Sequence, residues 1–196
     1  MKMFKWYQFN FILALMIMAL LGMQNCQNNQ KPEDTKEVAK EHNDAKFNEA
    51  DKEKDAKFLV NAAEINLKEI SLGKLAQQVS NTSDVKFLGK EMEEAHTKSL
   101  NDLSALAKQK TISIPASITD ETKNDYQKLA EKDRKEFDKE YCDMMVNGHK
   151  EAIALFEKAS TESSDADIKM WATNLLPDLR THLDHALTCQ KKYEKM

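Results

Sequence analysis

The sequence is poor in glycine and proline, with 4 and 3 among its 196 residues, and only 7% of it is aromatic. Lysine, glutamate, aspartate, alanine and leucine predominate instead, a composition typical of long helices with charged outer faces. Once a leader is subtracted, the chain has room for one domain of about 150 residues, which is enough to bury a hydrophobic core. We therefore expect an all-α protein with a single compact domain.

The sequence also lacks the common signatures of catalysis and of nucleic-acid binding. It contains no glycine-rich phosphate loop, no nucleophile elbow and no Cys-x-x-Cys motif. The formal net charge is -4, and Lys and Arg do not gather with interleaved aromatic residues, so we expect no nucleic-acid partner. The 10 methionines form no repeated Met-x-x-Met cluster and are interpreted as core residues rather than as a copper site. No catalytic activity of its own is evident.

The first residues have the layout of a signal peptide. Lys2 and Lys5 precede an apolar run from Phe9 to Met23, after which the chain turns polar at Gln24. The run is about 15 residues long, short of the roughly 20 that span a membrane as a helix. Removal or lipidation of this segment therefore fits better than a permanent anchor.

Cys26 stands where a bacterial lipoprotein signal places its modified cysteine. We interpret residues 1–26 as a signal peptide with lipidation at Cys26, and keep a cleaved soluble protein and an uncleaved anchor as alternatives. Residues 27–49 are polar and charged, so we expect a solvated tether there. Together these features predict a periplasmic or outer-membrane-anchored lipoprotein of the cell envelope, attached to a membrane through its lipid.

The rest of the chain, residues 50–193, repeats apolar residues at steps of three and four, the pattern of amphipathic helices. Polar or β-branched stretches interrupt this pattern, and Asp165 is placed to cap the last helix. Four long helices in two hairpins, with one short extra helix, predict a four-helix bundle. The expected helices cover residues 50–79, 84–108, 122–132, 134–159 and from 165 to about 193.

In an antiparallel hairpin, two residues at the same level along the axis have residue numbers with a constant sum, which the turn sets. This rule predicts which polar residues of neighbouring helices face each other. Glu69 and His96 face each other in the first hairpin, and Glu93 lies one turn from His96. In the second hairpin, His149 faces His182 in the same register in which Cys142 faces Cys189. Each of those pairs is seven residues from the other on both helices, which keeps them on matching faces.

These positions favour a buried layer of polar groups near the middle of the bundle that fixes the helix register and binds nothing. The alternatives are a metal site at the same height and groups scattered over the surface. For a metal site, imidazole and carboxylate ligands together suit iron, manganese or zinc. The expected ligands are Glu69, Glu93, His96, His149 and His182, with Asp138, Asp178 and His185 as further candidates.

Cys142 and Cys189 are candidates for a disulfide, because an extracytoplasmic location would permit one. That pairing leaves Cys26 for the lipid. The alternative is a pair of small buried apolar residues without a bond.

Several short motifs follow one another between about Asp55 and Tyr193. They are Ala62-Ala63, Glu69 to Ala76, Val85 to Leu88 with Met92 and His96, Phe137-Asp138 with Tyr141 and His149, and Leu176-Pro177 with Leu179 and His182. In this ordered set the sequence resembles a ferritin-like bacterial family known as domain of unknown function 4142, whose members are often described as outer-membrane or periplasmic proteins. The resemblance implies an exported ferritin-like helical bundle and supplies no reaction. It also implies that Glu69, His96, Asp138, His149 and His182 match recurring polar positions of the family.

Three functions are compatible with these observations. A lipid-anchored envelope module without chemistry of its own predicts that the polar residues pair among themselves. A metal-binding protein, acting as an oxidase or a metal store, predicts that several of them converge on one point. An envelope protein that binds a protein partner predicts a contiguous exposed apolar patch.

Overall fold

The structure, a computed structural model, describes residues 33–193 of the chain. This part is all-α, as predicted, and contains no strand. The expected leader and Cys26 lie outside the described residues. None of the helices within residues 33–193 is long and apolar enough to cross a membrane. The helices are α2 (Thr35–Asp44), α3 (Ala50–Val79), α4 (Ser83–Lys110), α5 (Asp120–Ala130), α6 (Arg134–Glu162) and α7 (Ala166–Tyr193).

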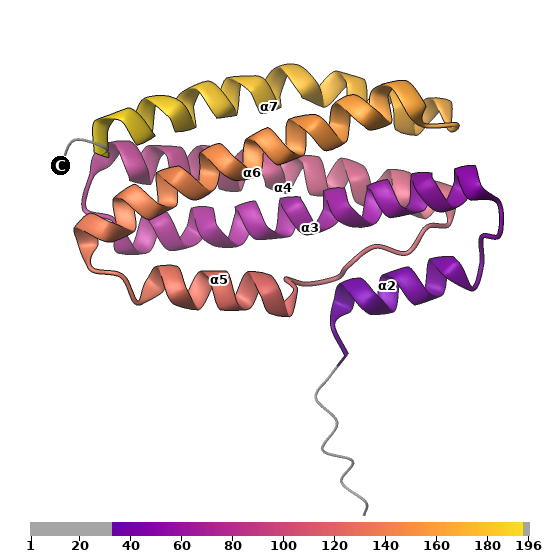
Figure 1. The fold of residues 1–196 in the computed structure, drawn as a ribbon, viewed down its shortest axis with the longest axis horizontal. Coiled ribbons are helices and arrows are strands. Elements are labelled where there is room, and N and C mark those ends of the chain that lie inside the picture. The colour runs from indigo at the N-terminus through magenta and orange to yellow at the C-terminus, as the bar shows by residue number, and fades with distance from the viewer. Residues whose placement is uncertain (1–32, 194–196) are drawn as a thin grey trace, which may run out of the picture. The chain divides into compact units, whose positions relative to one another are not determined.

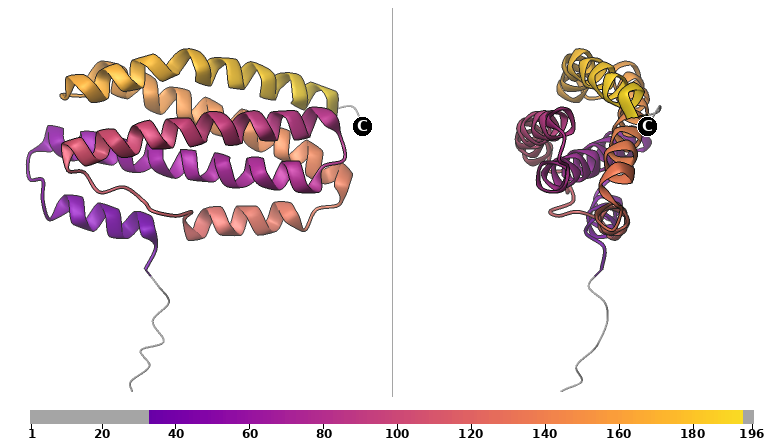
Figure 2. Two further views of the ribbon diagram at one scale, coloured as in Figure 1. Left: turned by 180° about the vertical axis from the view of Figure 1, so that it is seen from behind. Right: turned by 90° about the vertical axis from the view of Figure 1, so that its left-hand side faces the viewer.

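Four long helices form a ferritin-like bundle of two antiparallel hairpins, α3 with α4 and α6 with α7 (Figures 1 and 2). The hairpins pack side by side through contacts of α3 with α6 and of α4 with α7. Helices α4 and α6 run in the same direction, so the connection between them, which carries α5, returns along the length of the bundle (Figure 1). One long crossover of this kind is characteristic of ferritin-like folds.

Local capping explains where the later helices begin. The Asp133 carboxylate accepts hydrogen bonds from the first backbone N–H groups of α6, and Asp165 does the same for α7, as predicted, at 2.9 Å from the nitrogen of Asp167. Both satisfy donors that have no partner inside the helix. The Thr119 hydroxyl caps α5 in the same way, which places the start of that helix at Asp120 rather than at the expected residue 122.

The expected polar tether over residues 27–49 is wrong for its second half, because α2 forms there and packs on α3. The side chain of Asn43, which is 4% exposed, donates to the carbonyl of Ser113 and accepts from its N–H, both at 2.8 Å. Asp34 caps α2 and also accepts from the N–H of Asp120. These polar contacts attach the helix to the crossover loop, so composition alone did not reveal it.

The core consists of two apolar clusters along the bundle axis. One contains Leu72, Met92, Tyr141 and Met145, and the other contains Leu59, Leu103, Phe156 and Ala172 among others. The Sγ atoms of Cys142 and Cys189 are joined in a disulfide within the first cluster, with their Cα atoms 5.8 Å apart. Buried polar residues of all four long helices, among them Asn66 and three histidines, belong to neither cluster.

A buried aspartate secures each end of the bundle. At one end, Asp55 of α3 accepts hydrogen bonds from the hydroxyls of Ser163 and Ser164 in the turn between α6 and α7, at 2.7 and 2.8 Å. At the other end, Asp138 of α6 accepts a hydrogen bond from the hydroxyl of Thr82, in the turn between α3 and α4, at 3.1 Å. Each carboxylate therefore ties one hairpin to the other, which fixes the register of the central layer.

Helices α3 and α4 approach each other closely at two glycines, and Gly73→Ala is expected to destabilise the bundle. A Cβ at Gly73 would lie 2.5 Å from the carbonyl oxygen of Gly89. This is too short for a contact between a carbon and an oxygen atom, and a backbone oxygen cannot move aside as a flexible side chain can. Overpacking costs about 1–3 kcal/mol, while alanine gains about 1 kcal/mol over glycine in a helix, so a net loss of up to about 2 kcal/mol should appear in urea denaturation. The matched control is Gly148→Ala, whose Cβ would meet only a carboxylate oxygen of Glu69, at 3.0 Å. Equal effects of the two substitutions would contradict this explanation.

Candidate metal centre

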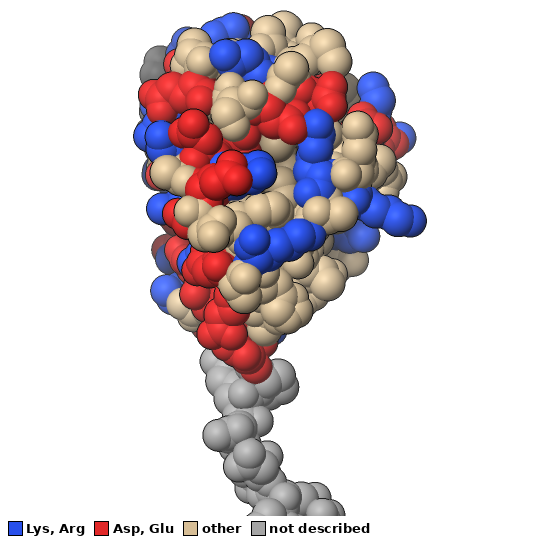
Figure 3. Space-filling model, turned by 90° about the vertical axis from the view of Figure 1, so that its right-hand side faces the viewer, with Lys and Arg blue, Asp and Glu red and all other residues tan. Residues whose placement is uncertain are grey.

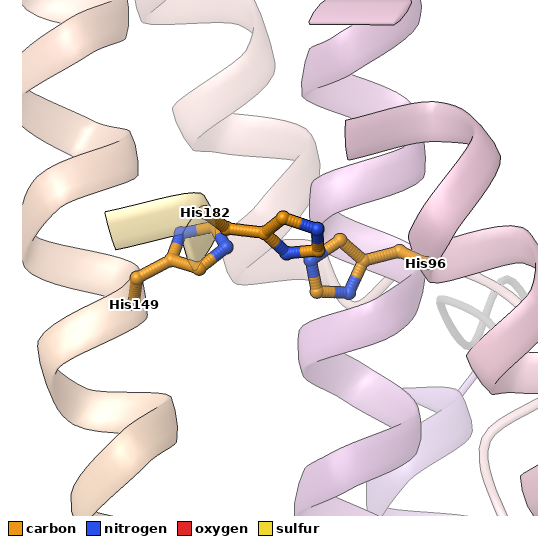
Figure 4. A group of neighbouring side chains, drawn as sticks. All are labelled: His96, His149 and His182. Carbon is orange, nitrogen blue, oxygen red and sulfur yellow. The ribbon is translucent and has the colours of Figure 1, made fainter. Parts of the chain in front are cut away.

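Three histidines from three different helices converge in the middle of the bundle. His96 of α4, His149 of α6 and His182 of α7 each offer one ring nitrogen, and these three atoms lie within 4.8 Å of one another. The ring centroids are 5.5–5.7 Å apart, and the rings face one another across the space between the helices (Figure 4). The side chains are 4%, 1% and 8% exposed respectively. The predicted convergence of these histidines is therefore present.

Hydrogen bonds determine which nitrogen of His96 and of His149 is available. The amide of Asn66 donates to the carbonyl of Ala62, so its oxygen must accept from Nδ1 of His96 at 2.9 Å. Nδ1 of His149 lies 2.8 Å from the carbonyl oxygen of Met145, which can only accept. Both Nδ1 atoms therefore carry the proton, and each Nε2 keeps a lone pair.

Three ring nitrogens of this cluster are buried without a hydrogen-bond partner among residues 33–193. They are Nε2 of His96, Nε2 of His149 and Nδ1 of His182. Leaving a buried polar atom unpaired costs about 1–3 kcal/mol, and buried groups in folded proteins are normally satisfied. Three such atoms in one cluster are an arrangement that a metal ion accepting nitrogen lone pairs would satisfy.

Burial keeps these imidazoles neutral. Desolvation lowers the pKa of His96 well below its ordinary value, and the neighbouring His149 and His182 lower it further. Desolvation likewise lowers the pKa of His149 from 6.5 to about 4, against the opposing hydrogen bond to Met145. The pKa of His182 is also lowered by burial, which nearby acidic groups partly oppose. Neutral imidazole is the form that binds metal ions.

Two of the predicted carboxylate ligands lie elsewhere. Glu93 of α4 contacts α3, where its Oε2 accepts a hydrogen bond from Gln77 at 2.7 Å and Lys74 lies 3.7 Å from its Oε1. Glu69 is 3% exposed and lies against Gly148 of α6, and it is not part of the histidine cluster. Desolvation raises the pKa of Glu69 to about 8, with Lys68 lowering it slightly.

The remaining candidates also lie outside the cluster. Asp138 is at the end of the bundle with Thr82. Asp178 is exposed and borders a small cavity beside His96 and His182. His185 is exposed, and its Nδ1 lies 2.9 Å from a carboxylate oxygen of Glu91. The structure thus reduces the eight predicted residues to three that meet.

Sequence reasoning missed Asn66, the hydrogen-bond partner of His96. A signal was present, because Asn66 lies three residues before Glu69 on a helix whose face was expected to meet His96. An asparagine on an apolar helix face needs a partner as much as a charged residue does. Its role is to orient one imidazole and to fix its proton on Nδ1.

Acidic and basic residues are interspersed on the outer surface, as Figure 3 shows for the end of the bundle where α6 turns into α7. The surface ion pairs join neighbouring residues of one helix or adjacent helices, for example Lys54 with Asp51 and Arg180 with Glu157. The positive charge is therefore not collected into one patch on this face.

A comparison with solved structures finds the same fold in a crystal structure of a DUF305 fragment from Deinococcus radiodurans, with a TM-score of 0.61 and 11% sequence identity. The alignment covers 73% of this chain and 97% of that one. At this identity the similarity concerns the fold alone. No curated protein matches the sequence. The model of the family described as Domain of unknown function (DUF4142) matches residues 37–188, and the chain therefore belongs to that family.

Proposed function

We propose that this protein is an exported, lipid-anchored protein of the bacterial cell envelope whose helical bundle binds one divalent transition-metal ion through His96, His149 and His182. The observation that carries the proposal is the convergence of three buried, neutral imidazoles with unpartnered ring nitrogens. Of the metals expected from the sequence, the all-nitrogen set favours zinc or iron over manganese, which prefers carboxylates, and it also suits copper.

The surroundings of the histidines support a site with three protein ligands and one further position. A cavity of about 30 Å³ borders His96, His182 and Asn66, which is enough to hold a water molecule. Tetrahedral zinc bound by three histidines commonly takes water as its fourth ligand. Two of the three histidines already have the hydrogen-bonded Nδ1 that orients metal-binding imidazoles.

The test is to purify the full chain without chelator, in mild detergent, and to measure metals per chain by elemental mass spectrometry before and after reconstitution. We expect close to one zinc, iron or copper per chain in the wild type, and loss of that metal in His182→Ala. His185→Ala is the matched control, since His185 is an exposed histidine of the same helix and should leave the metal content unchanged. Metal-free wild type after reconstitution would refute the proposal.

Asn66→Ala is expected to weaken zinc binding by about 10- to 100-fold, the usual effect of removing a hydrogen-bond partner of a metal-binding histidine. Without Asn66, the ring of His96 loses its orientation and its preferred tautomer. Calorimetric titration of the reconstituted protein measures the affinity. Asn61→Ala on the same helix is the control, and equal affinities of the wild type and Asn66→Ala would contradict the assigned role.

The lipid anchor is supported by the sequence of the leader, and Cys26 lies outside the described residues. Cys26→Ser is expected to move the protein from the membrane fraction to the soluble fraction of expressing cells. Fractionation and mass measurement of the mature chain test this. An unchanged membrane fraction together with an unmodified Cys26 would show that the attachment does not depend on lipidation.

A further inference from the structure

A cleft lies between α3, α5 and α6, and none of the three histidines lines it. Its volume is about 860 Å³, within the range of sites that bind small molecules. Its apolar lining comes from all three helices and includes Leu72, Leu129, Met144 and Met145. The cleft therefore offers a hydrophobic surface of small-molecule size.

Glu69 lines the inner part of this cleft and provides its one nine-tenths-buried charged group. Its Oε2 has no hydrogen-bond partner among residues 33–193. Its Oε1 lies beside Gly148, where a Cβ would come within 3.0 Å. The absence of a side chain at Gly148 thus keeps open the space next to the carboxylate. A buried carboxylate with an unpartnered oxygen on an apolar wall requires a partner that the described chain does not supply.

The rim of the cleft has an excess of negative charge. Lys68 pairs with Asp125 at 2.6 Å, and Lys132 lies 3.6 Å from Glu136. Apart from these pairs and the buried Glu69, the lining contains three glutamates and a single lysine, namely Glu131, Glu140, Glu151 and Lys128. Such a rim attracts cations and disfavours anions.

We propose that this cleft binds a small organic cation, a primary ammonium with a short hydrocarbon chain, whose ammonium group contacts the Glu69 carboxylate. The ammonium supplies the compensating charge and the donors that the buried carboxylate lacks. The hydrocarbon chain lies on the apolar wall formed by Leu129 and Met144. This site is independent of the proposed metal centre, because Glu69 is not among the converging residues.

The test follows the backbone amides of the full chain, in non-ionic detergent at pH 8, by two-dimensional NMR during titration with hexylammonium. Saturable shifts are expected for Leu72, Met145 and Gly148. Hexanol and hexanoate, which have the same chain without the positive charge, should bind at least tenfold more weakly. Equal binding of hexanol, or shifts that fall outside the cleft, would overturn the proposal.

Two variants examine the role of the carboxylate. Glu69→Gln keeps the shape of the side chain and is expected to weaken hexylammonium binding at least tenfold, whereas Glu94→Gln on the exposed face of α4 should leave it unchanged. Gly148→Ala is expected to weaken binding about threefold to tenfold by filling the space beside Oε1. Unchanged affinity in Glu69→Gln would overturn the proposal, and if that variant does not fold, unchanged affinity in Gly148→Ala decides against it.

Zinc alone is the remaining probe. If zinc displaces hexylammonium, the site binds metal rather than an organic cation, and the proposal is wrong. Zinc shifts that leave hexylammonium bound, including those of Met145 and Gly148 beside His149, leave the proposal intact. Because the metal centre has its own readout in metal content, failure of one proposal is distinguishable from failure of the other.

Discussion

Zinc at a free concentration of a thousand times its Kd is expected to raise the free energy of unfolding of this protein by about 4 kcal/mol, since a ligand that binds only the folded state stabilises it by mass action. The three unpartnered nitrogens of His96, His149 and His182 are brought together only by the folded bundle. Urea denaturation of the full chain in detergent, with zinc or with chelator, measures the difference.

The His149→Ala variant separates a metal centre from a purely structural polar layer. In chelator, the substitution removes packing but also removes a buried nitrogen that has no partner, and these two effects oppose each other. In zinc, the variant should lose the added stability of the wild type, so its destabilisation should be about 4 kcal/mol larger than in chelator. His185→Ala on α7 should respond to zinc like the wild type. If zinc does not stabilise the wild type, and His149→Ala loses the same unfolding free energy in zinc and in chelator, these histidines have a structural role alone.

Much of the fold could be predicted because helix periodicity and hairpin register are local properties. The position numbers that pair Cys142 with Cys189 also pair His149 with His182, and both pairs meet in the structure. Seven residues return a helix to nearly the same face, so one correct pair implied the other. Helix α2 was missed because polar side chains, above all Asn43, attach it to the crossover loop, and hydrophobic periodicity does not report such contacts.

The sequence predicted at which level along the bundle axis the polar residues lie, but not toward which neighbouring helix each side chain turns. Glu69 was expected to meet His96, and it lies instead against Gly148 and lines the cleft beside α6. Glu93 was expected to bind the same ion as His96, and it accepts a hydrogen bond from Gln77 of α3 instead. A residue at the edge of a buried stripe can turn toward either neighbouring helix, and that choice depends on packing around the whole bundle. Spacing along one helix does not determine it.

The stability of the metal-free protein is expected to be greatest close to pH 7. Below that value, His149 has its pKa lowered from 6.5 to about 4, so the unfolded chain holds more protons and acid favours unfolding. His96 and His182 shift in the same direction. Glu69 has its pKa raised from 4.5 to about 8, so between these values the folded chain holds the extra proton and stability falls as the pH rises. From pH 4.5 to about pH 7 the three histidines outweigh Glu69, and at higher pH Glu69 outweighs them.

Glu69→Gln should therefore remove the loss of stability on the alkaline side. Between pH 6.5 and 8 the wild type is expected to lose about 1.6 kcal/mol relative to the variant, because close to one proton is released from Glu69 on unfolding over these 1.5 units of pH, while the histidine contribution is the same in both proteins. The other groups with shifted pKa values titrate outside this window, since Asp143 and Asp165 are lowered from 3.8 while Tyr141 and Lys110 are raised from 10.0 and 10.5. Urea denaturation in chelator at both pH values measures the change of stability with pH, and Glu93→Gln on α4 is the control that should keep the wild-type change.

The comparison uses the change of stability with pH rather than the absolute stability. It therefore holds even though the glutamine amide is itself left without a partner in the cleft. The same change of stability with pH in the wild type and in Glu69→Gln would show that Glu69 is already ionised and paired at neutral pH, which would remove the physical basis assigned here to its burial.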